Sequence, residues 1–324
     1  MRRSLRAFLP AGGAVGALVL LAACGGSSQP SAPTSAPTPD TGVPAGTVLG
    51  VFSGETGEPV AGAHLVVFGK GYDTDSAGQM TLVERVPYGS LVDVTAPDFL
   101  DRQTLIRRNG SRRFVLWPRA TSFGVSQEYT AELVYTAGTA NPPPMGSSPL
   151  ERIRQGATQA VLVLSEEILK KEQPTTAHEV AVANINEALG GRVTYVLSPT
   201  KPATGIFFEV LVDPTEATCA SGSLAFAQVS YQSGEIVGGK VVYCRGNFVP
   251  TSLAVHELGH TAGLNHSPRH VDVMYRYEYG HERFTRAEVL TLGMLFERPG
   301  GNRFPDNDRD VAAGASGTRT IVCR

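Results

Sequence analysis

The stretch that decides the fold runs from Leu253 to His266 and reads LAVHELGHTAGLNH. Its strong helix formers end at a glycine, so we expect a helix that stops there. Residues four apart lie on the same face of a helix, and the imidazoles of His256 and His260 can therefore converge on one point. Two histidines presented in this way indicate a metal site.

Zinc is the metal that these residue types favour. Neutral imidazole suits zinc, and a catalytic zinc keeps three protein ligands and one open position for water. We expect His266 as the third ligand, because Gly263 can adopt the backbone angles that end a helix and turn the chain back. Glu257 directly follows His256, so its side chain lies beside the first ligand and points slightly away from it. This places the carboxylate to take a proton from zinc-bound water rather than to bind the zinc. A chance HExxH on a surface helix is the alternative, and the extension to Gly263 and His266 makes it improbable.

The motif His256-Glu257-x-x-His260-x-x-Gly263-x-x-His266 resembles that of the metzincin zinc metallopeptidases, in which a methionine turn follows. Here Met274 comes eight residues after the last histidine, within Asp272-Val273-Met274-Tyr275. The tyrosine directly after the methionine is similar to the matrixin-like branch. Arg276 occupies the position at which other branches carry a tyrosine ligand.

The resemblance implies an α+β catalytic domain, with a mixed twisted sheet, long helices, the zinc helix and the methionine turn. It also implies a zinc-dependent endopeptidase that acts on protein or peptide substrates, with Glu257 as the general base on zinc-bound water and one catalytic Zn²⁺. Because no cysteine except Cys24 precedes the catalytic region, a propeptide that blocks the zinc through a cysteine is not available.

Two rival functions remain open. A surface-anchored binding or adhesion protein could retain the zinc fold only as a scaffold, although the intact Glu257 argues against it. An HExxH hydrolase could instead use a downstream glutamate, Glu282 or Glu288, as third ligand. Among the other histidines, His270 is close to the motif, and we expect it on the loop surface rather than on the metal. His178 on the earlier helix and His281 on the loop after the methionine turn are expected to be solvated or structural.

The length and net charge of the chain limit the number of domains and the classes of partner that we expect. The chain has 324 residues, enough for two domains, and a formal net charge of −2, which gives no electrostatic reason to expect a nucleic-acid partner. The composition, with 42% hydrophobic and 18% charged residues, is that of a globular protein. We expect a monomer.

The first residues are typical of an exported, anchored protein. Residues 1–24 combine three arginines, an apolar run and small residues before Cys24, which is typical of a signal peptide. Leu21-Ala22-Ala23-Cys24 resembles a bacterial lipobox, which implies lipidation of Cys24; a signal peptide cut elsewhere is the alternative. Residues 25–46 are rich in Ser, Pro and Thr and predict a disordered linker. We therefore expect a bacterial cell-envelope protein, extracytoplasmic and lipid-anchored, at the outer membrane if the organism is Gram-negative.

A small β domain is predicted at 47–117. Short β-rich runs alternate with Gly- and Asp-rich turns, which is typical of an antiparallel β-sandwich. The turn residues resemble those of carboxypeptidase-regulatory-like, transthyretin-like domains: Gly57-Glu58-Pro59-Val60-Ala61-Gly62-Ala63, Asp75, Gly78 and Pro87-Tyr88-Gly89. His64 is isolated, so we assign this domain a role as spacer or adhesion module.

The remaining chain divides at a triple proline. We assign 118–149 to a linker with a strand-like segment EYTAELVYT at 128–136, and 150–298 to the metallopeptidase domain. Strands are expected at 160–164, 193–197, 206–212, 224–231 and 236–243, and helices at 176–189, from about Ser252, and from Thr285, whose capping box includes Glu288. By the resemblance, the strand near 224–230 is the edge strand of the cleft, whose unpaired backbone could hold an extended peptide.

Cysteines and acidic residues complete the expectations. In an exported protein we expect a disulfide between Cys219 and Cys244, which leaves Cys323 over. Residues 299–324 are assigned to a C-terminal tail. It carries Asp306, Asp308 and Asp310 at alternate positions, as calcium loops do, but the glycine and distal glutamate of such loops are missing. Structural calcium is thus unsupported, and a solvated acidic turn is expected.

Overall fold

The computed structural model describes residues 41–135, 148–245, 248–277, 280–308 and 316–323. Thr41–Arg324 forms one compact unit of mixed helices and strands, in agreement with the expected α+β class. Cys24 and the signal peptide, the first part of the linker, the triple proline and Asp310 lie outside the described residues. Within the described part, no helix is both long and apolar enough to cross a membrane.

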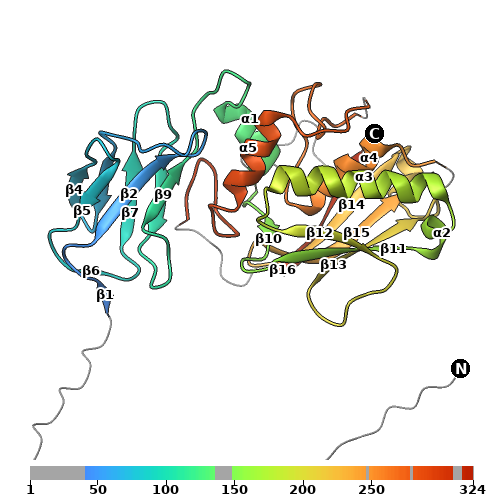
Figure 1. Cartoon of the computed structure of the whole chain (residues 1–324), viewed down its shortest axis with the longest axis horizontal. Helices are drawn as coiled ribbons and strands as arrows, with labels where there is room; N and C mark the ends of the chain where they lie inside the picture. Colours follow the sequence, from blue (N-terminus) through green and yellow to red (C-terminus); the bar gives the residue numbers. More distant parts are fainter. Residues whose placement is uncertain (1–40, 136–147, 246–247, 278–279, 309–315, 324) are drawn as a thin grey trace, which may run out of the picture. The chain divides into compact units, whose positions relative to one another are not determined.

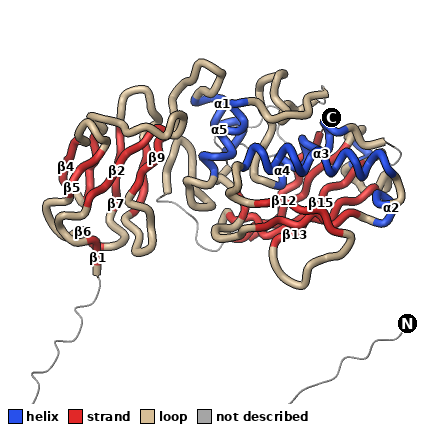
Figure 2. The backbone as a smooth tube through the Cα atoms, in the orientation of Figure 1, coloured by secondary structure: helices blue, strands red, loops and turns tan. Residues whose placement is uncertain are grey.

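The first strands form two small sheets and a short ribbon (Figures 1 and 2). Their bounds are β1 Gly42–Val43, β2 Val48–Ser53, β3 His64–Val67, β4 Lys70–Asp73, β5 Gln79–Thr81, β6 Val86–Pro87, β7 Leu91–Thr95, β8 Arg102–Leu105 and β9 Arg113–Leu116. The sheet orders are β5-β2-β9 and β4-β3-β7-β8, and β1 pairs with β6. Alternate side chains of both sheets, such as Leu49 and Leu65, enter one apolar cluster, so the segment is a small sandwich. It is not wholly antiparallel, because β9 runs parallel to β2.

The segment expected as a strand at 128–136 is a helix, so that prediction was wrong. Helix α1 spans Gln127–Tyr135, and its buried residues include Tyr129 and Leu133, one turn apart. The hydroxyl of Ser126 accepts a hydrogen bond from the N–H of Tyr129 at 3.1 Å, which satisfies one donor of the first turn. Aromatic and β-branched residues suggested a strand, and tertiary burial decided otherwise.

The main sheet has seven strands in the order β12-β11-β13-β15-β14-β16, with β10 also paired to β15. The bounds are β10 Arg152–Ile153, β11 Gln159–Leu164, β12 Thr194–Ser198, β13 Ile206–Val212, β14 Ala225–Gln232, β15 Glu235–Tyr243 and β16 Ser316–Cys323. Strands β11, β12, β13 and β15 run parallel to one another, whereas β14 is antiparallel to both of its neighbours. The five strands expected from the apolar runs are all present within about two residues.

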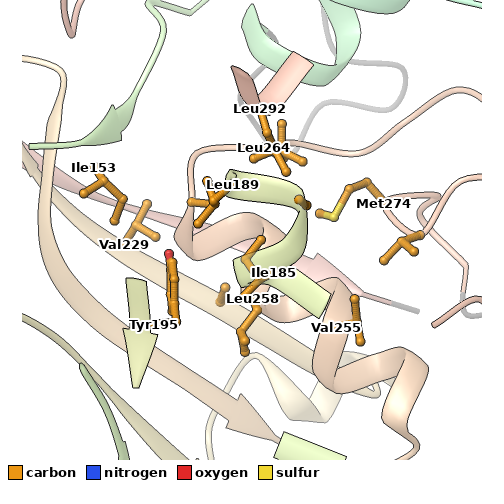
Figure 3. Close-up of a cluster of buried hydrophobic side chains, with 14 of the residues drawn as sticks. Ile153, Ile185, Leu189, Tyr195, Val229, Val255, Leu258, Leu264, Met274 and Leu292 are labelled. Carbon is orange, nitrogen blue, oxygen red and sulfur yellow. The ribbon is translucent and has the colours of Figure 1, made fainter. Parts of the chain in front are cut away.

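Helices α3 (Glu172–Leu189) and α4 (Thr251–Thr261) cover one face of this sheet (Figure 1). The other helices are α2 Glu166–Leu169 and α5 Arg286–Leu295, and a short 3-10 turn spans Cys219–Ser221. Figure 3 shows side chains of α3 (Ile185 and Leu189), α4 (Leu258) and β14 (Val229) in the buried cluster between them. The burial of these apolar side chains is the main favourable contribution to the free energy of folding, and it amounts to about 1.5 to 3 kcal/mol for each fully buried large aliphatic side chain.

Strand β16 overturns two expectations. Residues 299–324 do not form a simple tail, and β14 is not an edge strand, because Ser316–Cys323 pairs with it along its whole length from Gln232 to Ala225. The segment reads SGTRTIVC, and its polar alternation hides the strand in the sequence. Arg319 takes a position on the same side of the strand as Cys323, where an apolar residue would have revealed the pattern.

The acidic turn before β16 is buried rather than solvated. Asp306 and Asp308 are 1% and 2% exposed, respectively. Arg298 donates two hydrogen bonds to Asp306, at 2.7 Å from Nε and 2.6 Å from Nη2. Asp308 accepts from Thr104 of β8 at 2.6 Å and from Asn302. The carboxylates thus serve ion pairs and hydrogen bonds that join the segment after α5 to β8.

Candidate metal centre

Helix α4 presents the first two histidines. His256 and His260 lie one turn apart on this helix and are 2% and 0% exposed. Their ring centroids are 4.7 Å apart, with the rings nearly perpendicular. The spacing of four that the sequence shows is therefore realised on one buried helix face.

Gly263 brings the third histidine to the same place. Its φ is +112°, and a Cβ built on it would lie 2.2 Å from the backbone oxygen of Glu151, so no larger residue fits. The chain then returns, and the ring centroid of His266 lies 5.4 Å from that of His256 and 4.9 Å from that of His260. One ligand atom from each of the three histidines lies within 4.8 Å of the others.

Backbone carbonyls orient the first two rings. Nδ1 of His256 is 2.7 Å from the oxygen of Val273, and Nδ1 of His260 is 2.8 Å from the oxygen of Leu264. A carbonyl oxygen only accepts, so each Nδ1 carries the proton and each Nε2 is left with its lone pair. These two Nε2 atoms are 3.0 Å apart. Both rings therefore present a ligand atom toward one centre.

Burial and charge favour neutral histidines. Burial lowers the pKa of His260 and of His266 well below the usual value, and the charge of His256 lowers both further. Arg319 of β16 contributes in the same direction to both. Nε2 of His266 is buried and has no hydrogen-bond partner in the structure. Neutral rings with unpaired nitrogens are the form that binds a metal.

Glu257 lies between the first two histidines in sequence and is fully buried. Its side chain is 0% exposed, and neither carboxylate oxygen has a hydrogen-bond partner. Burial raises the pKa of Glu257 well above its usual value. A carboxylate in this state costs free energy unless a nearby cation or donor compensates it. The histidines and this acid together match the chemistry of a divalent cation with one water.

The methionine turn lies against α4. A Cβ built on Gly259 would lie 2.2 Å from Sδ of Met274, so the methionine packs directly on the helix between the two histidines. Met274 is fully buried, and Figure 3 shows it within the apolar cluster. Its N–H donates to Oε1 of Glu288 at 2.7 Å, while Oε2 accepts from the N–H of Thr285 at 2.7 Å. The predicted capping box of α5 is therefore present, and it also fixes the methionine turn.

The second role of Glu288 predicts a pH dependence of stability. Burial, and then the charge of Asp272, raises the pKa of Glu288 from 4.5 to about 7. Between these two pH values the folded chain holds a proton on Glu288 that the unfolded chain has released. The contribution of this group to the free energy of unfolding is therefore complete below pH 4.5 and is lost as the pH rises through 7. Across this window we expect the free energy of unfolding to fall by roughly 3 kcal/mol from this group.

Urea unfolding at a series of pH values checks this expectation. Glu288→Gln should flatten the slope between pH 4.5 and 7, and Glu179→Gln, an exposed acid on α3, should leave it unchanged. An unchanged slope in Glu288→Gln would show that another group sets it.

The other candidate residues lie apart from the three histidines. His270 is exposed, and its backbone oxygen is 2.9 Å from Nε2 of His281. His178 is buried and bonds to the oxygen of Pro174 and to Tyr243, which is a structural role. Neither Glu282 nor Glu288 belongs to a potential metal-binding group among the described residues. The structure contains the expected disulfide between Cys219 and Cys244, with a Cα separation of 5.2 Å.

The sequence missed the contribution of β16 to the site. Cys323 is buried and free of any disulfide, and its sulfur lies with one atom each of His256 and Glu257 in a group within 4.8 Å. Arg319 donates from Nη1 to Oδ1 of Asn265 at 2.6 Å, next to the third histidine. The only sign of this contact in the sequence was the unpaired count of cysteines, and the sequence alone does not show where Cys323 lies in the fold.

Comparisons with known proteins give no family for this chain. No model of a protein family matches it, and no curated protein matches it either. The site is thus defined by its own residues: three converging imidazoles, one buried and unpaired carboxylate, and the sulfur of the last described residue beside them.

Proposed function

We propose that the chain is a zinc-dependent endopeptidase that hydrolyses peptide bonds of protein substrates. The observation that carries the proposal is the convergence of His256, His260 and His266 within 4.8 Å. The donor set fits zinc, because it consists of three imidazoles, the number of ligands that many catalytic zinc sites take from the protein. The metzincin resemblance of the motif and of the methionine turn supports the same activity.

Each residue has a separate task in the proposed reaction. Zinc, when bound, supplies a Lewis acid that polarises the scissile carbonyl and makes water acidic enough to lose a proton near neutral pH. The three histidines hold the ion, and the oxygens of Val273 and Leu264 keep two of the rings in the required tautomer. Glu257 accepts the proton of the attacking water and passes it to the leaving amine. Its burial excludes competing solvent from that exchange.

Metal stoichiometry tests the ligand set. We expect one Zn²⁺ per chain after equilibrium dialysis, and loss of that ion in His260→Ala and in His266→Ala, because two imidazoles do not complete the site. His270→Ala is the matched control, since its side chain is exposed in the same loop, and it should keep the ion. Zinc retained in His266→Ala would favour a glutamate as third ligand and reject the proposed set.

Cleavage of a random peptide library tests the reaction. Zinc-loaded protein should cut internal peptide bonds, a chelator should stop the cleavage, and added Zn²⁺ should restore it. Zinc bound at full stoichiometry without cleavage in any variant would favour the rival of a binding or adhesion protein. The complete pairing of β14 by β16 is the observation that keeps this second candidate in view.

We further propose that the protein acts outside the cytoplasm, anchored through Cys24. Leu21-Ala22-Ala23-Cys24 supports lipidation, and the disulfide between Cys219 and Cys244 is of a kind that persists in oxidising compartments. Mass spectrometry of the mature N-terminus checks the anchor. A free, unmodified thiol at residue 24 would reject it.

A further inference from the structure

We propose that a cavity between the β-sandwich and helix α5 is a second binding site, which takes a peptide segment with both acidic and apolar side chains. This inference rests on the proposed peptidase function, because it names a part of the substrate that is held outside the metal centre. Its basis is a cavity of about 350 Å³ whose lining combines three arginines with apolar side chains. None of the residues that line it belongs to the three-histidine group, so it is a separate site.

Two segments far apart in the sequence form the walls of the cavity. One wall comes from the β-sandwich, where Gly54 follows β2 and Val115 lies in β9. The other wall is α5, which contributes Val289, Leu290 and Met294. A Cβ built on Gly54 would overlap with Sδ of Met294, so only a glycine allows this approach between the two walls. The cavity therefore depends on the β-sandwich as well as on α5.

Aromatic rings hold two of the three arginines. The guanidinium carbon of Arg286 lies 4.2 Å from the ring centroid of Phe123, and that of Arg113 lies 3.8 Å from the ring centroid of Phe52. An arginine stacked on an aromatic ring uses the face of its guanidinium group, so the N–H groups in the plane of that group remain able to donate. Two guanidinium groups at the cavity are thus oriented before a ligand binds.

The third arginine reaches the cavity across α5. Nη1 of Arg192 donates to the oxygen of Leu189 at 3.1 Å, which fixes the side chain just after the end of α3. A Cβ built on Gly293 of α5 would lie 3.3 Å from Nη2 of Arg192, closer than most side-chain contacts. Glycine is unfavourable in the interior of a helix, and space for this guanidinium group is a packing reason for its presence. The lining thus brings together arginines from three separate segments.

The acidic residues of the lining leave part of this positive charge uncompensated. Glu55 and Glu297 also line the cavity. Oε1 of Glu55 lies 4.0 Å from Nη2 of Arg286, at the limit for an ion pair. Within the described part of the chain, Arg113 and Arg192 form no ion pair. The remaining N–H donors of these two arginines are therefore available for a carboxylate of the ligand.

The lining matches an acidic and apolar peptide segment. Guanidinium groups bind carboxylates through paired N–H donors, while the apolar side chains of the lining favour leucine or phenylalanine beside the acid. A volume of about 350 Å³ is in the usual range for ligand cavities and accommodates a few side chains. Because the proposed substrate is a protein, we assign the ligand to a segment of that substrate away from the scissile bond.

Helix α5 links this cavity to the metal centre. Oε1 of Glu288, on the same helix, accepts from the N–H of Met274, which packs against the helix of His256 and His260. A substrate segment held in the cavity therefore stays near the metal, and this raises the effective concentration of its peptide bonds there. The expected consequence is a lower KM with an unchanged kcat, because the segment is bound equally before and during the reaction.

A direct binding measurement tests the site without relying on hydrolysis. The ligand is a short fluorescein-labelled peptide of alternating glutamate and leucine, and the protein is the full chain with Glu257→Gln, dialysed against zinc. We expect an increase in fluorescence anisotropy, with affinity about tenfold weaker in Arg192→Gln and in Arg286→Gln, because each variant loses a charge-assisted hydrogen bond. Arg283→Gln is the matched control: this exposed arginine precedes α5 without lining the cavity, and its loss should leave the affinity unchanged.

Two further peptides separate the parts of the ligand. Replacement of glutamate by glutamine removes the charge, and replacement of leucine by glycine removes the apolar side chains. We expect each change to weaken binding by about tenfold or more. Equal binding of the peptide of glutamate and glycine would show that a general attraction of charge is sufficient, and it would overturn the cavity as a specific site.

Hydrolysis tests whether the segment belongs to a substrate. Fluorogenic peptides share one cleavable sequence, and the extended versions carry the segment of glutamate and leucine at the amino or the carboxyl end through a flexible linker. We expect one of the extensions to lower KM about tenfold in the parent chain and less in Arg286→Gln, with kcat unchanged. A KM that is the same with and without either extension would overturn the role in substrate binding.

The outcomes separate this inference from the function on which it rests. Cleavage by the parent chain, with equal peptide affinity in Arg192→Gln, Arg286→Gln and Arg283→Gln, would overturn the cavity site and leave the peptidase intact. Binding that depends on Arg192 and Arg286 in a chain that cleaves no peptide would instead leave the binding site intact and overturn the peptidase. Binding that depends on these arginines, together with the lower KM, would support both.

Discussion

We expect the Glu257→Gln variant of the proposed peptidase to lose nearly all peptide hydrolysis and to keep its metal. The carboxylate is fully buried beside His256, and it is the group available to take the proton of the attacking water. Glutamine has nearly the same shape but cannot accept that proton, and general acid–base catalysis contributes about 100- to 10,000-fold. The comparison of kcat/KM between the variant and its parent measures the loss, and zinc stoichiometry on the same samples shows that the ligands are intact.

A matched control makes this experiment decisive. Glu282→Gln serves as control, because it removes an exposed carboxylate that has no part in the metal group. Hydrolysis by Glu257→Gln at the parent rate would exclude Glu257 as the base.

Arg298→Ala is the substitution with the largest expected effect on stability. The side chains of Arg298 and Asp306 are fully buried, and they form an ion pair with two hydrogen bonds. Removal of one partner leaves the other charge buried without compensation, which typically costs about 3 to 5 kcal/mol. Since Asn302 also bonds to Asp306, the loss spreads to the segment that leads toward β16. Urea unfolding should show the decrease directly.

An exposed arginine nearby supplies the matched control. Arg303→Ala removes a charge of the same kind from the surface and should change the free energy of unfolding by less than about 0.5 kcal/mol. If Arg298→Ala were as mild as Arg303→Ala, the buried pair would contribute no net stability. Replacement of both Arg298 and Asp306 by apolar residues should recover part of the loss, because no charge is then left unpaired.

The parts of the fold that could be predicted are those with a regular apolar period. Strand β11 coincides with a run of consecutive apolar residues. Helix α3 ends at Gly190, whose φ of +57° is the left-handed conformation typical of a glycine that ends a helix. Helix α1 could not be recognised in this way, because Tyr129 and Val134 favour strands by intrinsic preference. Only burial against the rest of the chain made that segment helical.

The candidate site was predictable to the extent that it is local in sequence. His256 and His260 share a helix, and Gly263 and His266 follow within six residues, so spacing alone placed them. The oxygen of Val273, the second role of Glu288 and the approach of Cys323 depend on segments that meet only in the folded chain. Periodicity along the sequence does not predict such long-range contacts. Strand β16, which brings Cys323 to the site, was itself not recognised because Arg319 interrupts its apolar pattern.

The pairing of β14 with β16 also bears on how the chain folds. Gln228 and Thr320 are 92 residues apart in sequence, so this pairing must close a long loop and should form late. Until then β14 presents an open edge that reads AFAQVSYQ, without a charged side chain to discourage the wrong partner. A nascent chain that has not yet reached residue 316 therefore carries an unpaired strand edge beside the helix that holds His256 and His260, and it loses that edge only when β16 is made.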